Sequence, residues 1–490
     1  MVSLKKLAGQ TAIYGGSYML SRFLNYLLVP LHTYIFQTGE YGEVSYLYAM
    51  SSLFIVLLTY GMETAYFRYS GEEQYRHATL PTVAISYACT SLLFVAVAFC
   101  FATRFAGWLH CPQHPEYVRW FALIIGADAF SAIFFASLRQ QKRPLRFAFV
   151  KNFNILVNIL FNLFFLLLCP FLQQQGIENA FLSYIYHSEI GVGYIFIANL
   201  IASLLTLVLL IPECFKTPVV FDFKLWKKMI RYALPLLVFG LAGIVNETMD
   251  RVMLRELLPP DIAEAHVGIY SACYKIAILM TLFIQAFKYA AEPFFFDQSK
   301  NTDARQTYAD VMSAFVLICS FLFLGIMMYI SIIKHFVGVN FRVGLPIVPI
   351  LLLANLCLGI YYNLSIWYKL TDKTRMGAYI SLFGACITIV FNYLLIPRLG
   401  YMGSAWATLV CYGGMMILSY FIGQKYYKVP YQKFRISGYI FLALLLYGLS
   451  LLVPVHETWI RLTVNTLFLL SYVIIIVWTD KSYLSRLLHK

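Results

Sequence analysis

A series of long apolar runs, separated by short polar segments, constrains this chain more than any other feature of its sequence. A helix needs about 20 apolar residues to cross a bilayer, whereas a strand of an outer-membrane barrel has about ten residues in strict alternation. Only helices satisfy the backbone of such long runs in lipid. The sequence therefore predicts an all-α polytopic membrane protein. We place fourteen transmembrane helices at residues 9–30, 42–62, 81–103, 119–138, 147–169, 190–211, 231–250, 267–290, 309–331, 343–364, 376–396, 401–423, 436–453 and 459–478.

The composition excludes other classes of protein. Only 12% of the 490 residues are charged and 61% are hydrophobic, whereas soluble proteins carry about 25% charged residues. A soluble enzyme, a disordered protein and a nucleic-acid-binding domain are therefore excluded. The net charge of +14 does not indicate a nucleic acid partner, because the lysines and arginines lie in short loops between apolar runs.

The same basic residues predict the orientation in the membrane. With both termini in the cytoplasm, 27 of the 37 lysines and arginines fall on the cytoplasmic side, which is the bias that orients membrane proteins. Lys151, four residues inside the span placed at 147–169, is counted among them. The charged Arg22 and the lack of a small-residue cleavage site argue against a removed signal peptide.

A weak internal repeat predicts two related halves. Residues 161–163 (FNL) match residues 391–393 (FNY), 230 residues later, and residues 40–46 correspond in place to 266–270. Such an offset implies two six-helix bundles related by an axis along the membrane normal, with a cavity between them. Chance similarity between apolar segments is the alternative. The predicted domains are 1–212 and 213–424, the two pseudo-symmetric bundles, and 425–490, two additional helices and a cytoplasmic tail.

Charged residues inside the spans are the candidate functional residues, because charge in lipid is costly and normally faces a cavity or a partner. At a rise of about 1.5 Å per residue, Arg22, Asp128 and Lys275 each lie about 12–14 Å below the outer face. A shared depth on three helices predicts one central chamber. Arg22 could instead extend to the outer headgroups. Asp128 could be the partner of a cation, or a carboxyl group that exchanges H⁺ or Na⁺ during transport.

Further charges lie at the ends of spans. Glu247 and Arg251 are spaced i,i+4 and can pair, and Asp250 with Arg251 is first interpreted as an ion pair at the membrane boundary. Residues at the cytoplasmic ends could form gate pairs or be ordinary solvated helix ends. These candidate gate residues are Glu63, Arg68 and Glu292.

The sequence predicts no enzymatic activity and no cofactor. It contains no G-x-S-x-G, no H-E-x-x-H and no phosphate loop. The ten cysteines are scattered without metal-binding spacing, so no metal site is expected. A membrane polymerase or glycosyltransferase would generally need a large outer loop, and the longest loops have about twenty residues.

At the residue level, the first 70 residues resemble bacterial polysaccharide-biosynthesis flippases, the O-antigen type exporters of the multidrug/oligosaccharidyl-lipid/polysaccharide superfamily. The resemblance lies in residues 9–15 (GQTAIYG), 22–31 (RFLNYLLVPL), 40–42 (EYG) and 59–68 (TYGMETAYFR). The rest of the chain matches in span count and layout.

The resemblance implies two six-helix bundles around a central cavity in the bacterial inner membrane. It also implies alternating access, driven by an H⁺ or Na⁺ gradient, that moves a polyprenyl-diphosphate-linked oligosaccharide to the outer leaflet. In related lipid II flippases basic residues of the first and eighth helices are important for the substrate diphosphate, and Arg22 and Lys275 occupy comparable helices here. A lysine cannot form the bidentate phosphate contact of an arginine, which weakens the assignment of Lys275.

Each candidate residue has an expected role in transport. The substrate-binding residues are Arg22, Lys275, Asn25 and Arg251, the ion-coupling residues are Asp128, Glu247 and Asp250, and the gate residues are those named above. The expected partners are the lipid-linked substrate, membrane lipids and polysaccharide assembly proteins, with the chain acting as a monomer. A multidrug or cation antiporter of the same superfamily is the alternative function, and a scaffold without transport activity would leave the buried charges unexplained.

Overall fold

The computed structural model describes residues 15–16, 19–176, 180–215, 219–299, 301, 303–454 and 457–481. The described residues form helices and connecting turns, with no strand among them. Thirteen of the described helices are long and apolar enough to cross a membrane. They coincide with the second to fourteenth predicted spans, so the prediction of an all-α multi-pass membrane protein is confirmed.

The first predicted span, residues 9–30, lies largely outside the described residues. Residues 19–26 are helical, and after a turn at Leu27 the chain continues as α2 (Leu28–Ile35). Pro30 has no backbone N–H to donate to an earlier carbonyl, which favours an interruption at this point.

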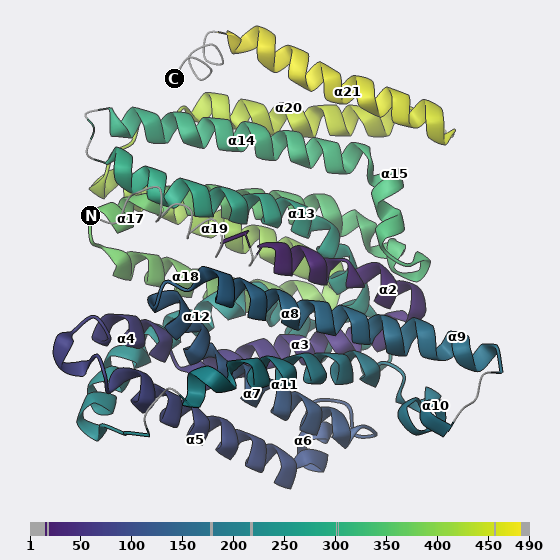
Figure 1. Ribbon diagram of the computed structural model, residues 1–490. Coiled ribbons are helices and arrows are strands. Elements are labelled where there is room, and N and C mark those ends of the chain that lie inside the picture. The colour runs from purple at the N-terminus through teal and green to yellow at the C-terminus, as the bar shows by residue number, and fades with distance from the viewer. Residues whose placement is uncertain are drawn as a thin grey trace. The chain divides into compact units, whose positions relative to one another are not determined.

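The chain divides into two compact units, Met1–Gly268 and Ile269–Lys490, which are described separately. The predicted domain boundary at residue 212 stays a prediction. In the first unit the helices, which Figure 1 labels, are α2, α3 (Thr38–Thr59), α4 (Met62–Tyr69), α5 (Thr79–Cys100), α6 (Ala102–Trp108), α7 (Pro115–Gln140), α8 (Pro144–Leu163), α9 (Cys169–Gln174), α10 (Ala180–Ile185), α11 (Gly193–Phe215) and α12 (Phe223–Leu257).

Helix α7 is the centre of the first unit. It is the most buried of the candidate spans described and packs against α3, α5, α8 and α11. A π-helical turn at Phe164–Leu168 joins α8 to α9, so the two form one continuous span. Tyr60 and Gly61, both with positive φ (29° and 71°), separate α3 from α4. Glycine suits this conformation, and a Cβ on Gly61 would lie 2.9 Å from the carbonyl oxygen of Ala233 on α12.

Helix α13 (Pro260–Gln298) runs from the first unit into the second. The other helices of the second unit are α14 (Ala304–Met328), α15 (Ile330–Ile333), α16 (Val348–Leu364), α17 (Ile366–Leu370), α18 (Thr374–Leu399), α19 (Tyr401–Tyr426), α20 (Lys433–Leu452) and α21 (Thr458–Thr479). Helix α19 packs against α16 and α18. The last two helices, α20 and α21, lie beside α14 (Figure 1).

Helices α3 and α13 cross at a close backbone contact inside the first unit. A Cβ on Gly42 would lie 1.9 Å from the carbonyl oxygen of Glu264, and a Cβ on Gly268 would lie 1.9 Å from that of Thr38. Gly42 and Gly268, like Thr38 and Glu264, are 226 residues apart in the sequence. The contact is therefore reciprocal between corresponding positions of the repeat.

Two asparagines of the repeat have matching surroundings in their own units. Asn162 on α8 and Asn392 on α18 are both fully buried, and each donates Nδ2 to the backbone carbonyl four residues earlier, at 2.8 Å. Oδ1 of Asn162 lies 2.8 Å from His32 Nε2, and that of Asn392 accepts a hydrogen bond from Ser404. A buried amide needs such partners, and these positions meet that need in the same way.

Candidate functional site: buried charges of the two units

The first helical segment carries Arg22 and Asn25 and is held against α8. Ser21 donates a hydrogen bond of 3.3 Å to Asn152 Oδ1, and His32 contacts Asn162 further along the same pair of segments. Arg22 is partly buried, and Asn25 is exposed. Both predicted substrate residues therefore lie on a segment that α8 positions.

Asp128 and Lys151 form a charge pair in the middle of the first unit. Asp128 is on α7 and Lys151 is on α8, and the two groups attract each other electrostatically. The Lys151 ammonium also lies 4.3 Å from the centroid of the Phe135 ring. Charges of opposite sign on neighbouring membrane helices lower each other's cost of burial.

The sequence pattern counted Lys151 with the cytoplasmic residues, although it lies inside the span predicted at 147–169, and the structure places it within a helix. Helix α8 begins at Pro144, so Lys151 lies two turns inside it. Proline is favoured at the first position of a helix, and Pro144 was the signal that could have shown where the helix starts.

Polar groups of two further helices surround Asp128. Tyr48 on α3 interacts with it electrostatically, and the Tyr48 hydroxyl accepts a hydrogen bond of 3.0 Å from Asn199 on α11. Asp128 thus lies where α3, α7, α8 and α11 meet. Groups on these four helices therefore set the electrostatic environment of the Asp128 carboxyl group.

The candidate gate residue Glu63 forms an ion pair with Arg139 of α7. Arg139 lies 11 residues beyond Asp128 on the same helix, a rise of about 16 Å. Both Glu63 and Arg139 act electrostatically on Lys151. Two acids and two bases from α4, α7 and α8 therefore form a continuous series of charges within the first unit, and sequence analysis found only Asp128 and Glu63.

The second candidate gate residue, Arg68, contacts aromatic rings. Its guanidinium lies 4.5 Å from the Tyr232 ring centroid and 5.7 Å from that of Tyr69. Such cation–π contacts hold an exposed arginine against a neighbouring helix, here α12.

On α12, Arg251 forms an ion pair with Asp250 at 2.9 Å. The same nitrogen donates to the backbone carbonyl of Glu247 at 2.8 Å, and the Glu247 residue is exposed. Arg255, one turn further on, pairs with Glu264 of α13 at 2.7 Å. The local interpretation of Asp250 and Arg251 as an ion pair agrees with this geometry, and their transport roles stay predictions.

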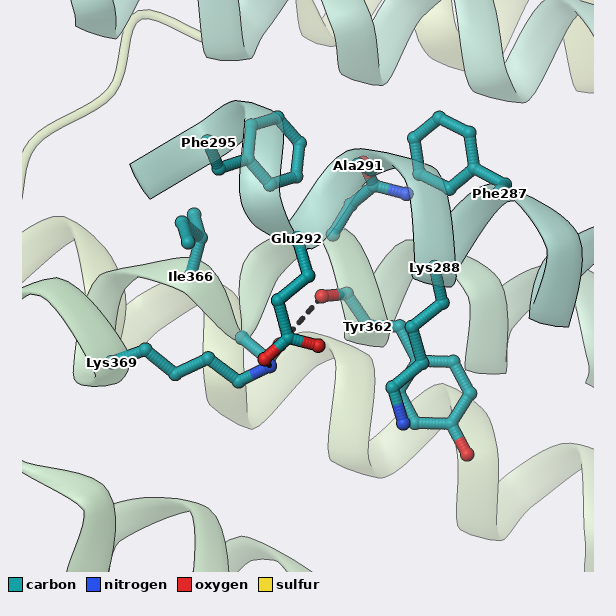
Figure 2. A pocket seen from close by; sticks show the side chains of 10 residues that line it. Phe287, Lys288, Ala291, Glu292, Phe295, Tyr362, Ile366 and Lys369 are labelled. Atoms are coloured by element: carbon teal, nitrogen blue, oxygen red, sulfur yellow. Dashed lines mark hydrogen bonds and ion pairs between the residues drawn. The ribbon is translucent and has the colours of Figure 1, made fainter. Parts of the chain in front are cut away.

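In the second unit, Lys275 lies on α13 and is partly buried. The prediction that Lys275 shares one chamber with Arg22 and Asp128 stays a prediction. The third candidate gate residue, Glu292, forms an ion pair of 2.8 Å with Lys369 of α17. This pair lines a small pocket with Lys288 and Tyr362, which Figure 2 shows.

Comparisons with known proteins add to this geometry. Residues 7–298 match the family described as polysaccharide biosynthesis protein. No curated protein sequence matches the chain. Among solved structures, lipid II flippase MurJ in an inward closed conformation shares the fold with a TM-score of 0.65, at 14% identity, over 95% of this chain and 99% of that one.

A second solved structure is an inward-facing multidrug resistance MATE family transporter of the MOP superfamily. It has a TM-score of 0.60 at 14% identity, over 88% of this chain and 95% of that one. A MATE structure in complex with MaD3S has a TM-score of 0.56 at 14% identity, over 89% and 96%. The likenesses show a common fold, and the family match covers more than half of the sequence. This multi-pass membrane protein therefore belongs to the polysaccharide biosynthesis protein family.

Proposed function

We propose that this protein is a flippase that moves a polyprenyl-diphosphate-linked oligosaccharide across the bacterial inner membrane. It works by alternating access, with both termini in the cytoplasm and with an H⁺ or Na⁺ gradient as the driving force. The observation that carries the proposal is the family match over residues 7–298. The fold shared with a lipid II flippase supports it, because lipid II is the substrate named for that protein.

The buried charges have roles that suit this substrate. Arg22 and Lys275, with Asn25 and Arg251, hold the diphosphate, because cations in a low-dielectric site form strong contacts with phosphate. Asp128, Glu247 and Asp250 couple the cycle to the driving cation. Lys151 joins this set as the electrostatic partner of Asp128. When Asp128 takes up a cation, its attraction for Lys151 falls, and this changes the balance of charge among the helices of the first unit.

Reconstitution into vesicles with a defined polyprenyl-diphosphate-linked sugar and an imposed H⁺ or Na⁺ gradient tests the proposal. We expect Arg22→Ala to reduce translocation about tenfold or more, as expected from the loss of a charge-assisted phosphate contact. Arg104→Ala is the matched control, because Arg104 is exposed and lies against Trp108. Wild-type translocation by a well-expressed Arg22→Ala protein would refute the role of Arg22.

An antiporter of drugs or cations is the second candidate, because MATE transporters share the fold. Drug resistance that depends on Asp128 would favour it. Sugar-chain elongation by the purified protein would instead favour an enzyme. We propose that the chain acts as a monomer with polysaccharide assembly proteins nearby, and a mass measurement in detergent checks the first part.

A further inference from the structure

The first turns of α12 carry four basic side chains on one side of the helix. Residues three or four apart lie on the same side of a helix, and all four basic residues are exposed. We call them the basic face of α12: Lys224, Lys227, Lys228 and Arg231. On another side of α12, Leu225 and Met229 are buried in a hydrophobic cluster with residues of α4 and α5. That packing holds α12 in place and leaves the basic face directed outward.

The folded chain compensates little of this positive charge. Lys228 donates a hydrogen bond of 2.6 Å to the Tyr75 hydroxyl, and Glu72 also attracts it electrostatically. The other three members of the basic face form no ion pair with any residue that the structure describes. The surface therefore carries an excess of positive charge that an external anion can neutralise.

The basic face does not serve the stability of the helix. It lies at the N-terminal end of α12, where the helix dipole disfavours cations. The acid that precedes it, Asp222, caps the helix, since its carboxylate accepts a hydrogen bond of 3.0 Å from the backbone N–H of Leu225. Four cations in this position point to a function outside the folding of α12.

The same side of α12 becomes apolar further along the helix. Leu234 and Val238, one and two turns beyond Arg231, are each 50% exposed. From Lys224 to Val238 the helix rises about 21 Å. Because α12 is one of the candidate membrane spans, cations at its N-terminal end followed by exposed apolar side chains match the headgroup and acyl chain of a lipid.

An aromatic pair lies beside the basic face. Phe223 is 63% exposed, and its ring stacks on that of Trp226 at 5.6 Å between centroids. Aromatic rings are enriched at the level of the lipid headgroups. The pair therefore indicates that the first turns of α12 lie at the membrane surface, which the basic residues predict to be the cytoplasmic one.

We propose that the basic face of α12 binds the headgroups of anionic phospholipids in the cytoplasmic leaflet, with acyl chains along Leu234 and Val238. Clusters of about four to eight lysines and arginines beside a membrane helix attract anionic lipids. The apolar continuation favours a lipid over a free phosphate or a soluble acidic protein. The inference goes beyond the proposed function, because it holds whatever substrate the protein moves.

The test is native mass spectrometry of the purified full-length protein in detergent. The probes are phosphatidylglycerol and phosphatidylcholine with the same acyl chains. We expect the wild-type protein to bind phosphatidylglycerol about tenfold more tightly than phosphatidylcholine. The triple variant Lys224→Gln/Lys227→Gln/Arg231→Gln should lose this preference, because it removes the uncompensated charges. Lys228 is kept because of its hydrogen bond to Tyr75.

Two further variants separate the location of the charge from its amount. Lys224→Arg/Lys227→Arg/Arg231→Lys keeps the charge and should keep the affinity for phosphatidylglycerol. Arg375→Gln/Lys428→Gln/Lys481→Gln is the matched control. It removes the same charge from three exposed residues that lie apart in the sequence and are also predicted to be cytoplasmic, and it should leave the affinity unchanged.

Three results would overturn the inference. Equal binding of the two lipids by the wild-type protein would show that the headgroup charge is not recognised. Unchanged affinity for phosphatidylglycerol in the triple glutamine variant would mean that these residues only orient the chain. An equal loss in the control variant would mean that binding follows the net charge and not the basic face.

Inorganic phosphate at constant ionic strength distinguishes the two sources of a phosphate group. We expect it not to displace phosphatidylglycerol, because it has no acyl chain to lie along Leu234 and Val238. Displacement that depends on the basic face would contradict the proposal, since the ligand would then be a free phosphate.

Discussion

Lys151 shows how a helix boundary decides the environment of a charge. Because α8 begins at Pro144, the Lys151 ammonium lies among membrane helices and near Asp128, not in a loop. The sequence identified Asp128, since an acid in the middle of an apolar run is conspicuous. It did not identify Lys151, because a base close to the start of the span predicted at 147–169 is not distinguished by composition from a solvated helix end.

The Asp128–Lys151 pair makes a first prediction. Asp128→Asn or Lys151→Met leaves the other charge without its partner, and each should lower the free energy of unfolding by about 1–3 kcal/mol. The double variant should lose less than the sum, with a coupling of about 0.5–3 kcal/mol. Thermal unfolding in detergent measures this, with the exposed Lys227→Met as control. Additive losses would show that the two groups do not interact.

A second prediction concerns Cys111, which lies between α6 and α7, outside the membrane-spanning helices. Burial raises the pKa of its thiol to about 12, so at pH 8 only about one molecule in ten thousand carries the reactive thiolate. A water-soluble maleimide should therefore label Cys111 in the unfolded protein and leave it unlabelled in the folded one. A cysteine introduced at the exposed Gln113 is the positive control. Rapid labelling of folded Cys111 at pH 8 would contradict its burial.

At the scale of the element, thirteen of the helices predicted from hydropathy are found among the described residues. The prediction succeeds because a run of about 20 apolar residues has no other stable state in lipid. Hydropathy could not predict the interruptions within them. The break at Tyr60 and Gly61 depends on φ values that neighbouring helices impose, and the π-helical turn at Phe164–Leu168 has no distinctive composition. The contact partners of the gate residues depend on which helices pack together. The sequence of a single helix does not predict that packing.

The crossing of α3 and α13 gives a prediction at this scale. Gly42→Ala or Gly268→Ala places a Cβ within 1.9 Å of a backbone carbonyl oxygen of the other helix. Since a backbone cannot move aside as a side chain can, each change should cost about 1–3 kcal/mol of stability. Gly243→Ala on α12 is the control, because nothing lies within 4 Å of its Cβ position. Equal thermal stability of all three variants would show that the helices do not cross this closely.

For the whole molecule, the distribution of lysine and arginine predicts which loops face the cytoplasm. Helix α7 separates the loop at Gln113 from the loop at Lys142. An alkaline phosphatase reporter fused after Gln113 should be active outside the cytoplasm, and one fused after Lys142 should be inactive. A green fluorescent reporter at the same positions should give the opposite result. The same activity at both sites would contradict a spanning α7, and a reversed result would invert the orientation.

The close backbone contact where α3 and α13 cross affects how these helices can move. Where large side chains interlock, two helices separate only after several side chains change rotamer. The space that these side chains leave must then be filled by other groups. At Gly42 and Gly268 main chain meets main chain, so these two residues have no side chain that must change rotamer when the helices shift. The fit of the two helices at this contact therefore depends on their main chains and not on interlocking side chains.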